Sequence, residues 1–173
     1  MWNETKFDLT RREIRTKRPF DQVVAAIEGQ APVVVPEANH VLLGREAIEA
    51  INAGRMDSDQ LRRQVEGKLG SSGFMLLMKI EHDLLMGDLG RKHRSVQFAI
   101  GNPLIAKDVS DAAPKVCLYT PLRIAVMEDE TDGSTWVLFD SAESLMGSFG
   151  SAAARSIGNS LDKKIVKLVE QAV

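Results

Sequence analysis

The sequence predicts an α+β fold, a two-layer sandwich with helices on one face of a mainly antiparallel sheet. Stretches in which apolar and polar residues alternate, as in strands, are separated by stretches with helical periodicity. Residues 123–129 and 134–139 predict two strands joined by a polar, glycine-containing hairpin turn. Residues 157–172 carry the apolar stripe of a helix that can cover such a sheet.

Length and composition describe an ordinary globular chain, which we expect to form a single domain over residues 1–173. A formal net charge of -2 argues against a nucleic-acid binder, which normally carries a basic surplus. No apolar run is long enough to span a bilayer and the N-terminus lacks a signal-peptide pattern, so we expect a cytoplasmic protein that does not bind membranes. Cys117 is the only cysteine, which excludes an intrachain disulfide.

The N-terminal segment predicts a strand followed by a helix. Residues 6–15 alternate well enough for a half-buried strand. A basic cluster accompanies this strand and consists of Arg11, Arg12, Arg15, Lys17 and Arg18. We expect the cluster on the solvent face of an edge strand, and the alternative is a phosphate-binding arm. Pro19 suits the first turn of the following helix, and Gly29 should end it.

The next segment, residues 30–56, gives the weakest pattern. Residues 33–35 indicate a short strand and residues 45–54 a short helix. His40 falls between them beside apolar residues, where a partly buried loop histidine is expected rather than a ligand.

A clearer helix and strand follow. Asp57 and Gln60 form a capping-box pattern at the start of a helix that should end at Gly70. Residues 74–82 are apolar on both faces at their start, which predicts a central strand. The methionines of this strand are expected to fill the core rather than to bind a metal.

An abrupt strand-to-helix junction is predicted at the sequence Gly101-Asn102-Pro103. Residues 96–100 alternate as a strand with one buried face. The proline keeps Asn102 out of the helical region, and asparagine is a preferred N-cap residue. Because proline suits the first helical position, a helix over 103–112 should begin directly off the sheet.

Two later features have plain structural interpretations. Residues 115–120 lie between two prolines and predict a short extended segment. Cys117 lies in it beside apolar neighbours, so a buried, inert thiol is expected rather than a nucleophile. The polar face of the C-terminal helix should be ordinary solvated surface, and it comprises Asp162, Lys163, Lys167 and Glu170.

Several short motifs, in order, resemble one family. They are KIEH at 79–82, FAIGNP at 98–103, LYTPLRIAVMEDE at 118–130, a DG turn at 132–133 and WVLFD at 136–140. Together they resemble domain of unknown function family 302, with the best match over residues 57–173. The resemblance implies a compact α+β fold that often forms dimers, and it implies no settled activity.

The chain also departs from that family. Relatives often follow the Gly-Asn-Pro motif with a Gly-Thr-x-Leu-Met pattern, whereas residues 106–110 here read AKDVS. A family pocket that needs a close approach to glycine at those positions, or a threonine hydroxyl there, is therefore not expected. Residues 30–56 look inserted or rebuilt relative to the family.

His82, Gly101 and Asn102 are the candidate ligand-binding residues. His82 ends an apolar strand between two carboxylates and matches the family's histidine, so it could act as a general base, a ligand to metal or haem, or a donor to an anion. The helix start at Asn102 could bind an anion through free N–H groups. The alternatives are a histidine satisfied by a neighbour and an asparagine that only caps its own helix.

We assign no metal site, because His40, His82 and His93 come from separate segments and lack the spacing of a helical metal pair. The first hypothesis is a binding module for a protein partner or a small ligand, for which a small anion is the candidate, and the chain is expected to form a homodimer. The alternative is an enzyme that uses His82 as general acid or base beside the helix start at Asn102. A third is a subunit that assembles through a strand edge or the C-terminal helix. The sequence does not identify a cofactor.

Overall fold

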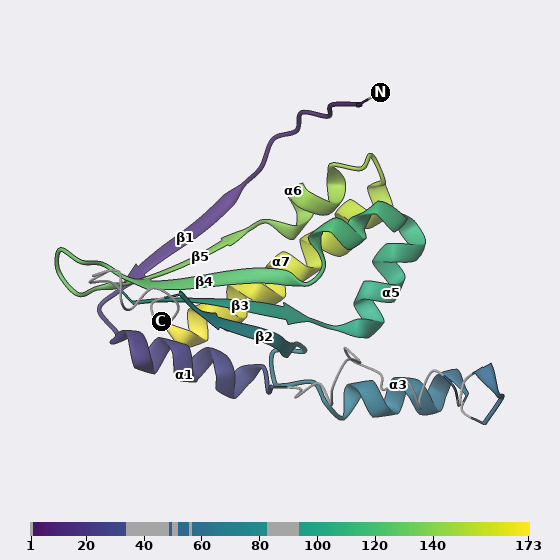
Figure 1. Cartoon of the computed structure of the whole chain (residues 1–173), viewed down its shortest axis with the longest axis horizontal. Helices are drawn as coiled ribbons and strands as arrows, with labels where there is room; N and C mark the ends of the chain where they lie inside the picture. Colours follow the sequence, from purple (N-terminus) through teal and green to yellow (C-terminus); the bar gives the residue numbers. More distant parts are fainter. Residues whose placement is uncertain (1, 34–48, 50–51, 56, 83–93) are drawn as a thin grey trace.

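The computed structural model describes residues 2–33, 49, 52–55, 57–82 and 94–173. It confirms the predicted α+β two-layer sandwich: the sheet has the order β1-β5-β4-β3-β2 with all neighbouring strands antiparallel, and helices cover one face (Figure 1). The strands are β1 (Arg11–Thr16), β2 (Met75–Glu81), β3 (Ser95–Gly101), β4 (Leu122–Glu128) and β5 (Thr135–Asp140). The helices are α1 (Phe20–Gln30), α3 (Ser58–Glu66), α5 (Pro103–Ala112), the 3₁₀-helix η2 (Pro114–Tyr119), α6 (Ala142–Gly147) and α7 (Ala152–Ala172).

Some expectations lie outside the described residues. They are His40, His93, the helix at 45–54 apart from a few of its residues, and most of the short strand at 33–35. None of the helices in the described part of the chain is long and apolar enough to cross a membrane.

One face of the sheet supplies the core. Inward side chains such as Phe98 in β3, Ile124 in β4 and Val137 in β5 are fully buried. Helix α7 covers them with its own apolar stripe, which includes Ile165 and Leu168. Because strand side chains alternate between faces, every second residue of β5, such as Trp136 and Leu138, lies on the face opposite the helices and is partly exposed.

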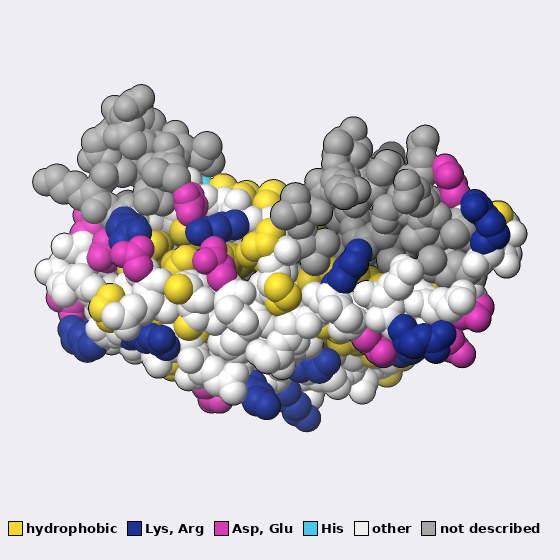
Figure 2. Space-filling model, turned by 90° about the horizontal axis from the view of Figure 1, so that it is seen from below, with side chains coloured by type: hydrophobic (Ala, Val, Ile, Leu, Met, Phe, Trp, Pro, Cys, Tyr) yellow, Lys and Arg dark blue, Asp and Glu magenta, His cyan; other side chains and the backbone are white. Residues whose placement is uncertain are grey.

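The predicted edge strand with its basic cluster is confirmed as β1, although it begins only at Arg11. The prediction that this strand is half-buried is wrong, because an edge strand has a neighbour on one side only and Arg11 to Arg15 are all exposed. Several charges of the cluster have partners, and Arg11 bonds Asp140 of the neighbouring strand at 2.7 Å. Arg18 donates to the carbonyl of Ala172 at 2.8 Å, where a cation favours the negative end of α7. Figure 2 shows the molecule from below the view of Figure 1, and on this face basic and acidic side chains are interspersed.

The prediction that residues 74–82 form a central strand is wrong, because β2 lies at an edge of the sheet. Its apolar start has another cause. Met75 and Leu76 are buried, and the Leu76 N–H donates to the carbonyl of Pro32 at 3.0 Å, beside a parallel bridge between Val33 and Leu76. A neighbouring segment therefore covers this stretch of the edge. Met78, expected in the core, is 50% exposed.

The capping box of α3 is confirmed, since Asp57 accepts from the N–H of Gln60 and the Gln60 side chain accepts from the N–H of Asp57. The helix ends at Glu66 rather than at Gly70. The glycine serves a different purpose: a Cβ at Gly70 would lie 2.0 Å from the carbonyl oxygen of Gln30, so only glycine allows this close approach.

The prediction of an extended segment with a buried Cys117 is also wrong. Residues 114–119 form the 3₁₀-helix η2, in which Val116 is buried and Cys117 is exposed. The physical reason is Pro114, whose fixed backbone angle suits the first helical position. A short helix of this kind turns only part of its surface to the core, and Cys117 faces away from it.

The expectation that Asp162 lies on solvated surface is wrong as well. It is 3% exposed and lies against the N-terminus of α6, a helix the sequence analysis did not predict. Its carboxylate accepts from the Ser141 hydroxyl and from the N–H of Ala142, both at 2.6 Å. The carboxylate tolerates burial because it accepts hydrogen bonds from the otherwise unbonded donors at the start of α6.

Candidate functional site

The strand-to-helix junction forms as predicted. Strand β3 ends at Gly101, and α5 begins at Pro103. Between them Asn102 has extended backbone angles and caps the helix: its Oδ1 accepts from the N–H groups of Leu104 at 3.0 Å and Ile105 at 3.4 Å. Its Nδ2 also donates to the carbonyl of Gly73 at 3.0 Å, which ties the junction to the start of β2.

These bonds occupy the donors that an anion would use. Proline has no N–H, the next two N–H groups point to the Asn102 side chain, and the N–H of Ala106 donates to the Asn102 carbonyl. An anion at this helix start would have to displace Asn102. The geometry therefore favours the alternative in which Asn102 caps its own helix.

A cavity of about 210 Å³ lies beside this junction. Its walls come from α5, the end of β3, the residues just before and within β2, the start of β4, and single residues of α6 and α7. The lining residues are Phe74, Leu77, Ile100, Gly101, Asn102, Pro103, Ile105, Ala106, Val109, Thr120, Pro121, Leu122, Met146 and Leu161. Almost all are apolar, so the described walls offer a mostly apolar, uncharged surface.

Leu77 and Gly101 meet at one wall of this cavity. The pairing of β2 with β3 shifts between Leu76 and Met78, which leaves Leu77 as the extra residue of a bulge. A Cβ placed on Gly101 would lie 3.1 Å from Leu77 Cδ1, closer than ordinary contact. Glycine thus leaves the space that the Leu77 side chain occupies.

The strand register separates His82 from this cavity. Met75 pairs with Gly101, whereas Glu81 pairs with Val96 at the other end of both strands. Six residues of strand span roughly 20 Å, so His82 and Gly101 lie at opposite ends of β2. The His82 residue is exposed and is absent from the cavity lining. The structure brings Gly101 and Asn102 together and leaves His82 apart.

No metal centre accompanies these residues. In the described ranges no group of three or more His, Cys, Asp or Glu side chains is placed to hold a metal ion. Of the three histidines in the sequence, only His82 is among the residues described.

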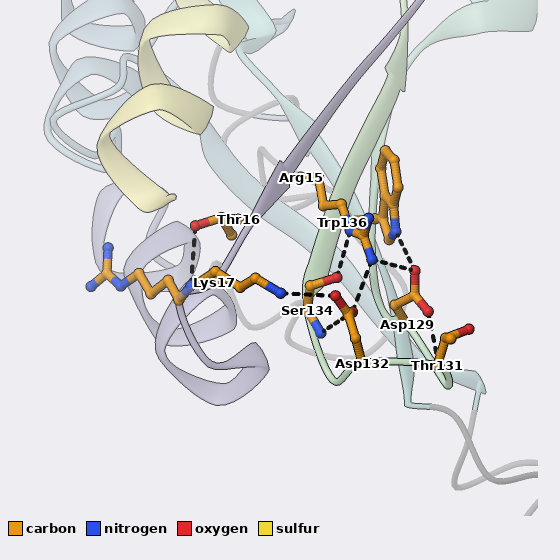
Figure 3. Close-up of polar contacts among 9 residues, drawn as sticks. Arg15, Thr16, Lys17, Asp129, Thr131, Asp132, Ser134 and Trp136 are labelled. Atoms are coloured by element: carbon orange, nitrogen blue, oxygen red, sulfur yellow. Dashed lines mark hydrogen bonds and ion pairs between the residues drawn. The ribbon is translucent and has the colours of Figure 1, made fainter.

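A second polar cluster joins β1 to the β4–β5 turn. Figure 3 shows its members, which include Arg15, Thr16, Lys17, Asp129, Thr131, Asp132, Ser134 and Trp136. Arg15 contacts both Asp129, at 3.2 Å, and Asp132, at 2.9 Å, and lies 5.3 Å from the centre of the Trp136 ring. Lys17 bonds Asp132 at 2.8 Å.

The electrostatics of this cluster lower the pKa values of its carboxyl groups. The Lys17 ammonium and the Ser134 donors hold the pKa of Asp132 well below its ordinary value. The Trp136 indole N–H and the Thr131 backbone N–H lower the pKa of Asp129. Because both carboxylates are already bonded to side chains of the same chain, the cluster fixes β1 to the hairpin, and we assign it no ligand.

Sequence reasoning missed most of the cavity wall. Leu77, Met146 and Leu161 come from three distant segments, and no local pattern links them. One available signal was Ser141 followed by Glu143 and two apolar residues, which is typical of a helix start and would have predicted α6.

Comparison with known proteins bears on the whole chain. Residues 50–172 match the family described as "Domain of unknown function DUF302". The chain belongs to this family. The resemblance inferred from the motifs is thus confirmed, and the DUF302 match includes the Gly-Asn-Pro junction and all the strands except β1.

A solved structure shares the fold of this DUF302 protein. It is the crystal structure of an uncharacterized conserved DUF302 protein from Bacillus stearothermophilus, with a TM-score of 0.63 and 13% sequence identity. The similarity covers 94% of this chain and 98% of the other. No curated protein matches the sequence. The comparisons therefore establish the family and the fold.

Proposed function

We propose that this DUF302 domain is a non-catalytic binding module whose small ligand occupies the cavity beside Asn102. The observation that carries the proposal is the cavity itself, about 210 Å³ in volume and bordered by Gly101 and Asn102. Ligand sites in proteins are commonly concave and mostly apolar with a few polar groups. This cavity has that character, and rigid elements of the fold form its walls.

The alternative of an enzyme based on His82 has less support. That hypothesis requires the imidazole to lie beside the helix start at Asn102, and the register places it at the far end of β2. Cys117 offers no replacement, because the exposed thiol lies outside the cavity lining. Binding without catalysis is therefore the better-supported function.

Blocking the cavity tests the proposal. Ala106 lines the cavity on α5, so Ala106→Leu should fill part of it. Ala153→Leu makes the same change at an exposed position in the first turn of α7 and serves as the matched control. Thermal unfolding is measured against a set of neutral, anionic and cationic small molecules. We expect at least one compound to raise the Tm of the wild type and of the control but not the Tm of Ala106→Leu.

Two outcomes would contradict the proposal. One is that no compound in the set raises the wild-type Tm. The other is that Ala106→Leu, while still folded by circular dichroism, responds to the same compounds as the wild type. Turnover of a bound compound that is lost in His82→Ala would favour the enzyme instead.

We further propose that the domain forms a homodimer in the cytoplasm. The supporting observation is the sheet face opposite the helices, where Trp136, Leu138 and Met127 are partly exposed next to one another. Sedimentation velocity at several concentrations tests this, and a monomer at all micromolar concentrations would contradict it.

A further inference from the structure

The cavity walls restrict the charge of any occupant. Among the described residues that line it, none carries a charged side chain. Moving an ionised carboxylate or ammonium group into such a site without a partner is strongly unfavourable. The first-turn N–H groups of α5, which could have stabilised an anion, are already bonded to Asn102. We therefore expect the part of an occupant that lies between these walls to be uncharged, in contrast to the anion that the sequence suggested.

Among the described side chains that line the cavity, Asn102 and Thr120 carry groups that can form hydrogen bonds. The Asn102 side chain bonds at both ends, to its own helix and to the Gly73 carbonyl. The Thr120 hydroxyl, by contrast, lies 3.5 Å from the carbonyl of Cys117. That distance is long for a hydroxyl bond, which is usually about 2.5–3.0 Å, so a ligand can compete for this hydroxyl.

The volume limits the size of the occupant. A cavity of about 150 Å³ lined by apolar side chains binds benzene. In proportion, the 210 Å³ here fits about eight non-hydrogen atoms. A substituted benzene ring or a short branched chain has this size, whereas part of a fused two-ring system would lie outside the walls.

Leu77 is placed to set this limit. Its side chain comes from a strand bulge, a feature that redirects side chains, and it lies over Gly101 at the cavity wall. Truncating this side chain to a methyl group would enlarge the cavity from that side without removing any atom of the helix cap at Asn102. The wall opposite is made of helix α5, whose backbone is fixed by that cap.

We infer that the ligand of this cavity is a neutral, largely apolar molecule of about eight non-hydrogen atoms, bearing at most one hydroxyl or carbonyl group for Thr120, with Leu77 as the size-determining residue. The inference rests on the proposed binding function and gives the class of its ligand.

Three related compounds test the class. Benzyl alcohol has the predicted size and one hydroxyl, benzoate is its anionic counterpart, and 1-naphthalenemethanol adds a second ring. Binding is followed by methyl NMR shifts of Ile100, Val109 and Leu122, which line the cavity. Titrating each compound and following these shifts gives its Kd for the wild type. We expect the Kd of benzyl alcohol to be at least about tenfold lower than that of benzoate or 1-naphthalenemethanol, a difference of about 1.4 kcal/mol.

Two variants test the roles of the walls. Leu77→Ala should tighten 1-naphthalenemethanol binding by about tenfold, a difference of about 1.4 kcal/mol, whereas Leu118→Ala should leave it unchanged. Leu118 is the matched control because it is 71% exposed and lies outside the cavity. Thr120→Val should weaken the binding of benzyl alcohol. It should leave the binding of toluene unchanged, because toluene has no hydroxyl group.

The outcomes separate this inference from the proposed function. If benzoate binds the cavity as tightly as benzyl alcohol, the ligand class is wrong and the binding function stands. If 1-naphthalenemethanol binds the wild type well and Leu77→Ala changes nothing, Leu77 does not determine size. If wild-type resonances of the cavity respond to no compound here or in the thermal set, both the proposed function and this inference are overturned.

Discussion

The carboxylate of Asp162, within α7, accepts a 2.6 Å hydrogen bond from the hydroxyl of Ser141, the N-cap residue of α6. The same carboxylate accepts from the N–H of Ala142 at 2.6 Å. One helix thus satisfies the free N–H groups at the start of another. The contact also holds α6 against α7, and Met146 of α6 and Leu161 of α7 both border the cavity.

Removing this carboxylate should destabilise the fold. Asp162→Ala leaves buried donors without acceptors, so we expect the free energy of unfolding to fall by about 1–3 kcal/mol. Urea denaturation measures the change. Asp108→Ala, at an exposed position of α5, should have little effect, and equal losses in the two variants would contradict the buried role.

Two glycines in helices should respond in opposite directions to alanine. A Cβ at Gly158 of α7 would lie 2.5 Å from the carbonyl oxygen of Ala142, so Gly158→Ala should destabilise by about 1–3 kcal/mol. Gly29 of α1 has no atom within 4 Å of an added Cβ, so Gly29→Ala should stabilise by about 0.5–1 kcal/mol. Chemical denaturation of both variants distinguishes close packing from helix propensity, and changes of the same sign would contradict this account.

The two roles of Asn102 can be separated. Asn102→Ala removes the helix cap and the bond to Gly73, and should cost about 2 kcal/mol of unfolding free energy. Asn102→Asp keeps the capping oxygen but replaces the donor to Gly73 with an acceptor. Any decrease in its unfolding free energy should therefore come from the contact with Gly73. Urea titrations measure both values. If Asn102→Ala matches the wild type, neither contact contributes.

The cluster around Asp132 predicts an acid-dependent loss of stability. Its pKa in the folded chain is lowered, mainly by the Lys17 ammonium. A depressed folded pKa contributes stability above the unfolded value of about 3.9, and that contribution is lost as the pH falls toward the folded pKa. We therefore expect the unfolding free energy of the wild type to fall more steeply below about pH 4 than that of Asp132→Asn.

Denaturant titrations between about pH 5 and pH 2 measure this slope. Lys17→Met keeps the carboxylate but removes its main partner, so it should also flatten the profile. Parallel profiles for the wild type and both variants would show that the contact does not couple protonation to folding.

Local chemistry explains what the sequence predicted well. The caps at Asp57 and Asn102 depend on residues within three positions of each other, so they can be recognised without a fold. The two-layer arrangement follows from the alternation of strand and helix patterns. The buried face of β3 likewise follows from its own period of two residues.

The errors arose where distant segments decide the outcome. Residues 74–82 look central in sequence, yet the strand lies at an edge because a neighbouring segment covers its start. Asp162 looks solvated on its own helix, and only the presence of α6 makes it buried. The contact of Leu77 with Gly101 needs both a strand pairing and a shift in that pairing, which no local pattern encodes.

The place of β1 in the sheet has a consequence for synthesis. This strand leaves the ribosome well before its partner β5, because Arg15 and Ser134, which bond each other, are 119 residues apart. Until β5 has been synthesised, the nascent chain carries β1 as an unpaired strand that could associate with other chains. The sequence RREIRT, with charges at four of six positions, counters that hazard, because charged residues discourage a lone strand from pairing wrongly. Arg11 and Arg15, which bond Asp140 and Asp132 in the folded chain, thus also protect the strand from wrong pairing before β5 is synthesised.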